Sequence, residues 1–223
     1  MDLSDVSLYV ICAILGNWCG ESTINPGIWE GMEPAEDYHV LYHGYGLGQW
    51  TNTGDDPNGR LWQFYSWMTS NNYDLWDPYG QIQYFVYENT WYQTEEASPW
   101  SSLQEFLLSD STDLRALTEA FCIGWEGIHD ETWENRINYA FTIYDYIMQY
   151  ANDPAITDWV ISNEYLPFED RWNNAVLIYR YFASGAIAPV PTPDYPPTPG
   201  PGPGPGPGKK RKKMPVWMMI KYF

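Results

Sequence analysis

Apolar residues recur at helical spacing along most of the chain, and this pattern predicts a mainly α-helical protein. The first run, residues 8–15, is almost entirely apolar, so we expect a helix that is buried on most of its sides. Pro26 excludes helical geometry at the residue before it, and this helix must therefore end by about Ser22. Asp2 or Ser4 is placed to cap its start. Three further stripes predict three more helices: Leu61, Phe64, Tyr65 and Met68; Ile82, Phe85 and Val86; and Leu103, Phe106 and Leu107.

The same periodicity returns in the second half of the chain. We expect further helices over residues 113–123, 136–148, 156–164 and 168–183. Thr112 is the expected cap of the first of these. Glycine and proline punctuate residues 27–60 instead, which predicts an irregular segment with short strands. The fold class is therefore mainly α (α+β), a helical domain with a small β/loop region.

Composition divides the chain into four parts. After residue 185 proline and glycine become frequent and then alternate, so no core can form and the segment stays extended without being rigid. A short basic and apolar segment follows this linker. We therefore expect residues 1–150 to form the main domain, 151–185 an additional helical segment packed on it, 186–208 the linker, and 209–223 a C-terminal tether.

Charge is distributed unevenly along the chain, whose formal net charge is −18 at pH 7. Residues 1–208 hold five arginines and all 29 acidic residues, whereas residues 209–223 hold six basic residues and no acid. The acidic part is repelled by nucleic acid, so we expect no nucleic-acid partner. The basic and apolar tail can bind an anionic membrane or another protein, and the sequence leaves both partners open.

The cysteines and the N-terminus indicate where the protein is made. Cys12, Cys19 and Cys122 are odd in number and lie in apolar surroundings, which favours buried free thiols in a reducing compartment. Their spacing fits no zinc site, and we expect no metal ion or organic cofactor. The N-terminus has no basic segment before its apolar run, and no stretch is long enough to span a membrane. We therefore expect synthesis in the cytoplasm without a signal peptide.

Glu21 lies in the last turn of the first predicted helix, which is an unfavourable place for a negative charge. The helix dipole repels a carboxylate there, and apolar neighbours such as Trp18 desolvate it. Both effects favour the protonated form that a general acid needs. On the same argument we expect that replacing Glu21 with Gln leaves stability unchanged or slightly improved. The competing interpretation is that Glu21 is the first solvated residue after a core helix.

A second motif is Gly-Tyr-Gly-Leu-Gly-Gln-Trp-Thr at residues 44–51, where three glycines in five residues mark a tight backbone path. Together with Glu21-Ser22 and Asn25-Pro26, this segment resembles the phage tail lysozyme family and, more distantly, goose-type lysozymes and soluble lytic transglycosylases. Weaker matches continue through Arg60-Leu61, Trp125-Glu126 and residues 136–140. The resemblance covers roughly residues 5–148, although the chain lacks the proline that commonly follows the Glu of the Trp-Glu pair.

The resemblance implies a phage virion-associated hydrolase that cleaves the β-1,4 glycosidic bond between N-acetylmuramic acid and N-acetylglucosamine in peptidoglycan. It makes Glu21 the general acid, and it places the sugar chain against Tyr45, Gly46, Gly48, Gln49 and Trp50. A hydrolase also uses a second carboxylate, for which the candidates are Asp55, Asp56 and Glu126. Asp55 and Asp56 fit a turn at least as well, and Glu126 fits an ion pair with Arg136 equally well.

Two other functions remain open on the same residues. A lytic transglycosylase needs no second carboxylate, because the sugar's own hydroxyl attacks the anomeric carbon. A non-catalytic structural or glycan-binding module on a lysozyme scaffold shares every residue and differs only in what Glu21 does. In a phage the protein would be made in the host cytoplasm and assembled into the tail. Residues 209–223 would bind other virion proteins or an anionic membrane.

Overall fold

A computed structural model describes residues 3–30, 43–52, 58–92, 99–128, 133–156 and 168–184. Within these ranges it contains one short 3-10 turn and seven α-helices, which confirms the predicted mainly helical fold. In chain order the elements are η1 (Leu3–Asp5), α1 (Leu8–Ser22), α2 (Arg60–Ser70), α3 (Pro78–Glu88), α4 (Leu103–Leu107), α5 (Leu114–Gly124), α6 (Trp133–Tyr150) and α7 (Phe168–Ser184).

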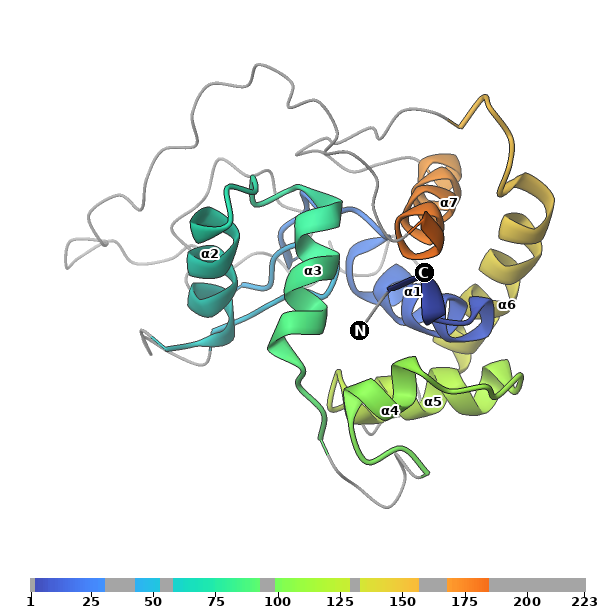
Figure 1. Cartoon of the computed structure of the whole chain (residues 1–223), viewed down its shortest axis with the longest axis horizontal. Coiled ribbons are helices and arrows are strands. Elements are labelled where there is room, and N and C mark those ends of the chain that lie inside the picture. Colours follow the sequence, from blue (N-terminus) through green and yellow to red (C-terminus); the bar gives the residue numbers. More distant parts are fainter. Residues whose placement is uncertain are drawn as a thin grey trace, which may run out of the picture.

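Helix α1 is the central element of the fold. It packs against α5, α6 and α7 (Figure 1), and its residues from Val10 to Cys19 are buried. An apolar surface on all sides requires such a position, because every face of the helix must be removed from water. The helix ends at Ser22 as predicted, and Thr23 leaves it in the left-handed conformation with φ of 55°.

Two predicted helix caps are wrong by a few residues. The cap of α1 is Ser7, whose side chain accepts a hydrogen bond from the Val10 backbone N–H, because the preceding Leu3–Asp5 forms a separate turn. The cap of α5 is Asp113 rather than its neighbour Thr112, and its carboxylate accepts from the Ala116 N–H. In both cases the capping side chain lies three residues before the N–H that it accepts from, which is the usual capping geometry.

Gly16 sets the distance between α1 and α6. A Cβ atom at this position would lie 2.7 Å from the Cβ atom of Ala140 and 2.7 Å from the carbonyl oxygen of Arg136. The two helix backbones therefore meet where α1 has no side chain, and only glycine allows this approach. The contact brings the first turns of α6 against the second half of α1, where Glu21 lies one helical turn beyond Asn17.

Figure 1 places α2 and α3 to one side of the bundle formed by α1, α5, α6 and α7. Leu61, Phe64 and Met68 on α2 are buried as predicted, whereas Tyr65 is only partly covered. The ring of Trp125, which follows α5, contacts Trp18, Trp50 and Phe85 from three different parts of the chain. This aromatic cluster joins the two groups of helices in one continuous core.

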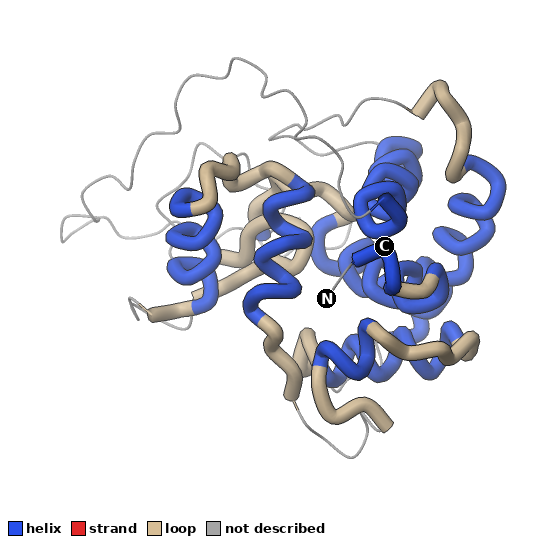
Figure 2. Tube along the Cα trace, in the orientation of Figure 1, coloured by secondary structure: helices blue, strands red, loops and turns tan. Residues whose placement is uncertain are grey.

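The expected short strands are not present in the described part of residues 27–60. Isolated antiparallel bridges join Tyr45 to Trp29 and to Trp50, and Figure 2 shows only helices and loops in the described residues. The chain turns through Gly46–Gln49 immediately after Tyr45, so that no ladder of paired residues can form. The described part of this region is therefore a loop held by two bridges.

Helix α7 packs against η1, α1 and α6. Trp172, Val176 and Phe182 on this helix are buried, and Tyr146 on α6 donates a hydrogen bond to Asn173 at 2.9 Å. The helix predicted over residues 156–164 lies outside the described residues from residue 157 onward, as do the linker and the tail. The division of the chain into a main domain, residues 1–150, and an additional helical segment, residues 151–185, stays a prediction.

Two further predictions concern the cysteines and the membrane. All three cysteines are buried and free, as expected from their apolar surroundings. Burial raises the pKa of the Cys19 thiol to about 11, although Arg171 and Arg136 oppose this shift, so the thiol stays protonated at neutral pH. None of the helices described is long and apolar enough to cross a membrane.

Candidate active site

The site begins at the end of α1, where Ser22 attaches the helix to the glycine-rich loop. The Ser22 hydroxyl lies 2.9 Å from the carbonyl oxygen of Leu47 and 3.1 Å from that of Trp18, and it can donate to either one. Glu21, the preceding residue, is partly buried, with 20% of its side chain exposed. The Glu-Ser pair therefore fixes the loop against the helix end that carries the carboxylate.

Gln81 on α3 holds the glycine-rich loop in place through hydrogen bonds. The side-chain oxygen of Gln81 accepts from the Leu47 backbone N–H at 2.9 Å, and its amide nitrogen donates to the Pro26 carbonyl at 2.7 Å. Gly46 adopts φ of 76°, and a Cβ atom there would lie 2.7 Å from the Gln81 side chain. A Cβ atom on Gly48 would lie 2.3 Å from the ring of Trp125. Both glycines are thus required by close packing of the loop on its support.

The loop residues expected to contact sugar differ in their exposure. Tyr45 and Trp50 are buried, and the Trp50 ring stacks on Phe64 with ring centroids 4.6 Å apart. These two aromatic residues therefore support the loop from inside. Gln49 is partly exposed, and its amide nitrogen donates to the Gly46 carbonyl at 2.9 Å while its buried oxygen has no hydrogen-bond partner. Because this oxygen is buried within the loop, the part of Gln49 that a ligand can reach is the rest of its partly exposed side chain.

Glu21 forms an ion pair with Arg136, which reaches it from α6. Another nitrogen of the same guanidinium donates to the Asn17 carbonyl at 3.1 Å, and only 8% of the Arg136 side chain is exposed. A Cβ atom at Gly20 would lie 3.4 Å from the Arg136 Cζ atom, which is an ordinary contact, so this arrangement does not require glycine there. Arg136, predicted from the sequence as a possible partner of Glu126, therefore pairs with Glu21 instead.

Glu126 follows α5 and faces the same group of charges. Its Oε1 atom is buried and has no hydrogen-bond partner, although the residue as a whole is partly exposed. Desolvation raises the pKa of Glu126 well above its ordinary value, and the charge of Glu21 raises it further, while Arg136 and Arg60 oppose the shift. Arg136 pairs with Glu21 and makes no hydrogen bond to Glu126. The structure thus brings two of the predicted carboxyl groups, Glu21 and Glu126, within electrostatic reach of each other.

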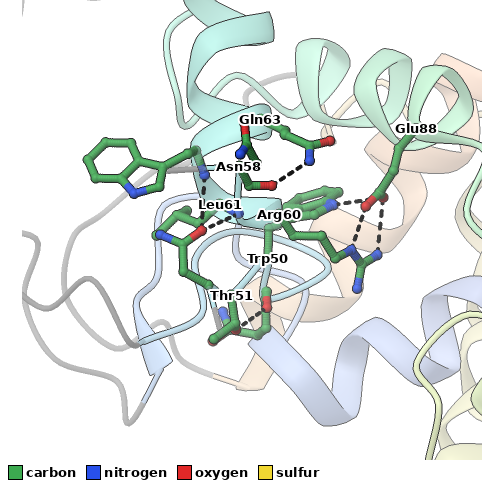
Figure 3. A network of polar contacts seen from close by, with 10 residues as sticks. Trp50, Thr51, Asn58, Arg60, Leu61, Gln63 and Glu88 are labelled. Atoms are coloured by element: carbon green, nitrogen blue, oxygen red, sulfur yellow. Dashed lines mark hydrogen bonds and ion pairs between the residues drawn. The ribbon is translucent and has the colours of Figure 1, made fainter. Parts of the chain in front are cut away.

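A second ion pair joins Arg60 on α2 to Glu88 on α3 (Figure 3). Arg60 binds Glu88 through two nitrogens, at 2.5 and 3.1 Å, and the indole N–H of Trp50 donates to the same carboxylate at 3.1 Å. The Arg60 guanidinium lies over the Trp125 ring, 4.8 Å from its centroid. Only 6% of the Glu88 side chain is exposed. The role of Glu88 was not predicted from the sequence. The one local signal for it was an acidic residue at the end of the apolar stripe of α3.

The remaining carboxyl candidates, Asp55 and Asp56, lie outside the described residues. Within the described part of the chain, no group of three or more His, Cys, Asp or Glu residues is arranged to hold a metal ion. Of the charged groups described here, Glu21 combines partial exposure with a position beside the glycine-rich loop, so it is the carboxyl group placed to exchange a proton with a ligand.

The sequence model described as phage tail lysozyme matches residues 4–147 of the chain. The chain belongs to the phage tail lysozyme family. The match spans Glu21, the glycine-rich loop, Glu126 and Arg136, and it confirms the resemblance seen in the two motifs. A phage tail lysozyme is a lysozyme-like, peptidoglycan-lytic protein of the glycosidase type that is associated with the virion tail. Helix α7 lies beyond the matched residues.

Proposed function

We propose that this phage tail lysozyme hydrolyses the β-1,4 bond between N-acetylmuramic acid and N-acetylglucosamine, with Glu21 as general acid. The supporting observation is the position of Glu21 at the end of a buried helix, beside the glycine-rich loop and within reach of the charge of Glu126. In this proposal Glu21 protonates the glycosidic oxygen as the bond to the anomeric carbon breaks. Gln49 holds the sugar chain, and its partial exposure beside the buried residues of the loop supports this role.

The other predicted sugar contacts enter the proposal with different roles. Gly46 and Gly48 are buried like Tyr45 and Trp50, so in this proposal these four residues fix the loop backbone that positions Gln49 against the sugar chain. The second carboxylate is Glu126, Asp55 or Asp56, and Glu126 is the one for which proximity to Glu21 supports the role. No metal ion or organic cofactor takes part in this scheme.

Lytic transglycosylation is the second candidate reaction, and the state of Glu126 favours it. Desolvation raises the pKa of Glu126 and so favours its protonated form, and a protonated carboxyl group cannot accept a proton from water. A transglycosylase avoids this step, because a hydroxyl of the substrate closes an anhydro ring. The two reactions therefore differ in whether a second carboxylate is needed.

The products of peptidoglycan digestion distinguish the two reactions. For a hydrolase we expect muropeptides with reducing ends, and a loss of rate of about tenfold or more in Glu126→Gln, Asp55→Asn or Asp56→Asn. Mass spectrometry of the digest measures both the end group and the rate. Anhydro products, formed equally fast by all three variants, would instead identify a transglycosylase. A wild-type protein that binds peptidoglycan without cleaving it would support the non-catalytic module.

The C-terminal segment is proposed as a tether to another virion protein or to an anionic membrane. Deleting residues 209–223 should leave cleavage of soluble glycan fragments unchanged, because the proline- and glycine-rich linker separates the tail from the site. Association with the anchor should fall and become less sensitive to salt, since the deleted segment carries six of the eleven basic residues. Co-sedimentation with anionic vesicles and co-purification with virion proteins test the two anchors. Equal retention of both forms in both assays would show that the segment is no tether.

A further inference from the structure

The chain leaves α1 through two consecutive residues in the left-handed conformation. Thr23 has φ of 55° and Ile24 has φ of 57°. Both side chains branch at the β-carbon, which makes this conformation unfavourable because the side chain crowds the backbone. Glycine and asparagine are the usual residues at such a helix end. The turn that begins two residues after Glu21 is therefore strained, and other contacts must hold it in place.

Contacts with α1 itself hold only part of this turn. The backbone N–H groups of Thr23 and Ile24 both donate to the Trp18 carbonyl, the second of them over a long 3.4 Å. The Thr23 hydroxyl is buried and has no hydrogen-bond partner among the described residues, so it contributes no hydrogen bond to the turn. None of these groups contacts the carbonyl of Ile24, through which the chain continues.

Helix α7 supplies the contact at the Ile24 carbonyl. The side-chain amide of Asn174 donates to that oxygen at 3.1 Å, and both residues are buried. They lie 150 positions apart in the sequence, so the contact exists only because α7 packs against the end of α1. Losing a buried hydrogen bond of this kind is costly, because no water replaces the missing donor at the carbonyl.

Two further contacts fix α7 against the helices around the site. Arg171, near the start of α7, is buried, and its guanidinium lies 3.7 Å from the sulfur of Cys19 on α1. Arg180, near the other end, donates to the Asp153 carbonyl at 2.7 Å, just after the end of α6. Helix α7 also packs on α3, which holds the glycine-rich loop (Figure 1). Asn174 is therefore carried by a helix that is fixed to α1 and to α6.

We propose that α7 is part of the catalytic unit and that Asn174 is a positioning residue for Glu21. By holding the Ile24 carbonyl, Asn174 keeps the strained turn in its left-handed conformation. The turn in turn fixes the end of α1, where the Ser22 hydroxyl contacts the glycine-rich loop and Glu21 faces the substrate. The proposal rests on the proposed function, in which Glu21 is the general acid. It gives a role in the reaction to α7, which lies beyond the residues 4–147 that match the family.

The separate values of kcat and KM on soluble peptidoglycan fragments test this role. In Asn174→Ala the turn loses its donor and can relax, which displaces Glu21 from the glycosidic oxygen. A small displacement of a catalytic group lowers the rate of the chemical step, so we expect kcat to fall by about tenfold or more and KM to stay within about twofold. Rates are divided by the folded fraction, measured by circular dichroism at the assay temperature, so that lower stability alone changes neither value.

The matched control is Asn173→Ala, the same substitution at the neighbouring residue. Asn173 accepts a hydrogen bond from Tyr146 on α6 at 2.9 Å, so this variant also loses one side-chain hydrogen bond of α7. We expect its kcat to stay at the wild-type value, because the lost contact is not at the turn. An unchanged kcat in Asn174→Ala, or an equal fall in both variants, would overturn the proposal.

A second substitution tests whether Asn174 acts through the turn. Glycine adopts the left-handed conformation without strain, and replacing Thr23 removes a hydroxyl that makes no hydrogen bond in the described part of the protein. We therefore expect Thr23→Gly, added to Asn174→Ala, to restore most of the lost kcat. No restoration would show that the loss does not come from the turn, and this role of Asn174 would be rejected.

Backbone NMR tests the contact without substrate. The Cα and Cβ chemical shifts of Ile24 report its backbone conformation. We expect them to move away from left-handed values in Asn174→Ala and to stay in place in Asn173→Ala. Shifts that are unchanged in Asn174→Ala would contradict the proposal. If the wild type cleaves no peptidoglycan, the proposed function fails, whereas the NMR result still decides whether α7 fixes the turn.

Discussion

Replacing Glu21 with Gln should lower the rate of glycan cleavage by about two orders of magnitude or more. The amide keeps the shape and the hydrogen-bond acceptor that Arg136 contacts, but it has no proton to give to the glycosidic oxygen. A zymogram on peptidoglycan with the wild type beside the variant gives the first measurement, and rates on soluble fragments give the factor. Lysis by Glu21→Gln at the wild-type rate would remove Glu21 from the mechanism.

The ion pair with Arg136 also changes the expected stability of this variant. The helix dipole and desolvation by themselves predict unchanged or slightly improved stability for Glu21→Gln. In the structure the Arg136 side chain is nearly buried, so removing the charge of Glu21 leaves a guanidinium with weaker compensation. We expect a loss of about 1–2 kcal/mol, reduced because Glu21 is partly exposed and Gln can still accept a hydrogen bond. Chemical denaturation measures this loss. A midpoint equal to or higher than that of the wild type would favour the expectation from the helix dipole and desolvation.

Gly16→Ala should lower the free energy of unfolding by about 2 kcal/mol or more, because the added methyl group meets backbone atoms of α6. The nearest atoms are the Arg136 carbonyl oxygen at 2.7 Å and the Ala140 nitrogen at 2.9 Å, and neither can move without displacing the helix. The better helix propensity of alanine, worth about 1 kcal/mol, offsets only part of this cost. Since Arg136 lies on the displaced helix, the ion pair with Glu21 and the cleavage rate should suffer as well.

Gly20→Ala is the matched control on the same helix. A Cβ atom there would lie 3.4 Å from the Arg136 Cζ atom, which is an ordinary contact with a side chain. The free energy of unfolding of this variant should equal that of the wild type or exceed it by up to about 1 kcal/mol, because alanine has the better helix propensity. Thermal unfolding of the pair measures the contrast, for which we expect a midpoint difference of roughly 4–8 °C. Equal midpoints for the two variants would show that α1 and α6 do not approach each other at Gly16 as described.

Local sequence was sufficient to predict most of the helices and the position of Glu21 at the end of α1. The apolar run of α1 and the restriction imposed by Pro26 were sufficient to predict a buried helix that ends at Ser22 with Glu21 in its last turn. The stripes on α2, α3 and α4 predicted their buried faces, because periodicity is a property of neighbouring residues. The ordered pair of motifs also indicated the family.

Only the tertiary structure decided what surrounds Glu21. Its partner Arg136 lies 115 residues further along the chain, and no local pattern specifies which of several acids a distant arginine will meet. Glu88 and its ion pair with Arg60 were missed for the same reason. Burial of Trp50 and of Glu126 Oε1 likewise depends on how α2, α3 and α5 pack around the loop. Periodicity shows which face of a helix is buried, whereas the charge balance of a site depends on side chains that come together only when the helices pack.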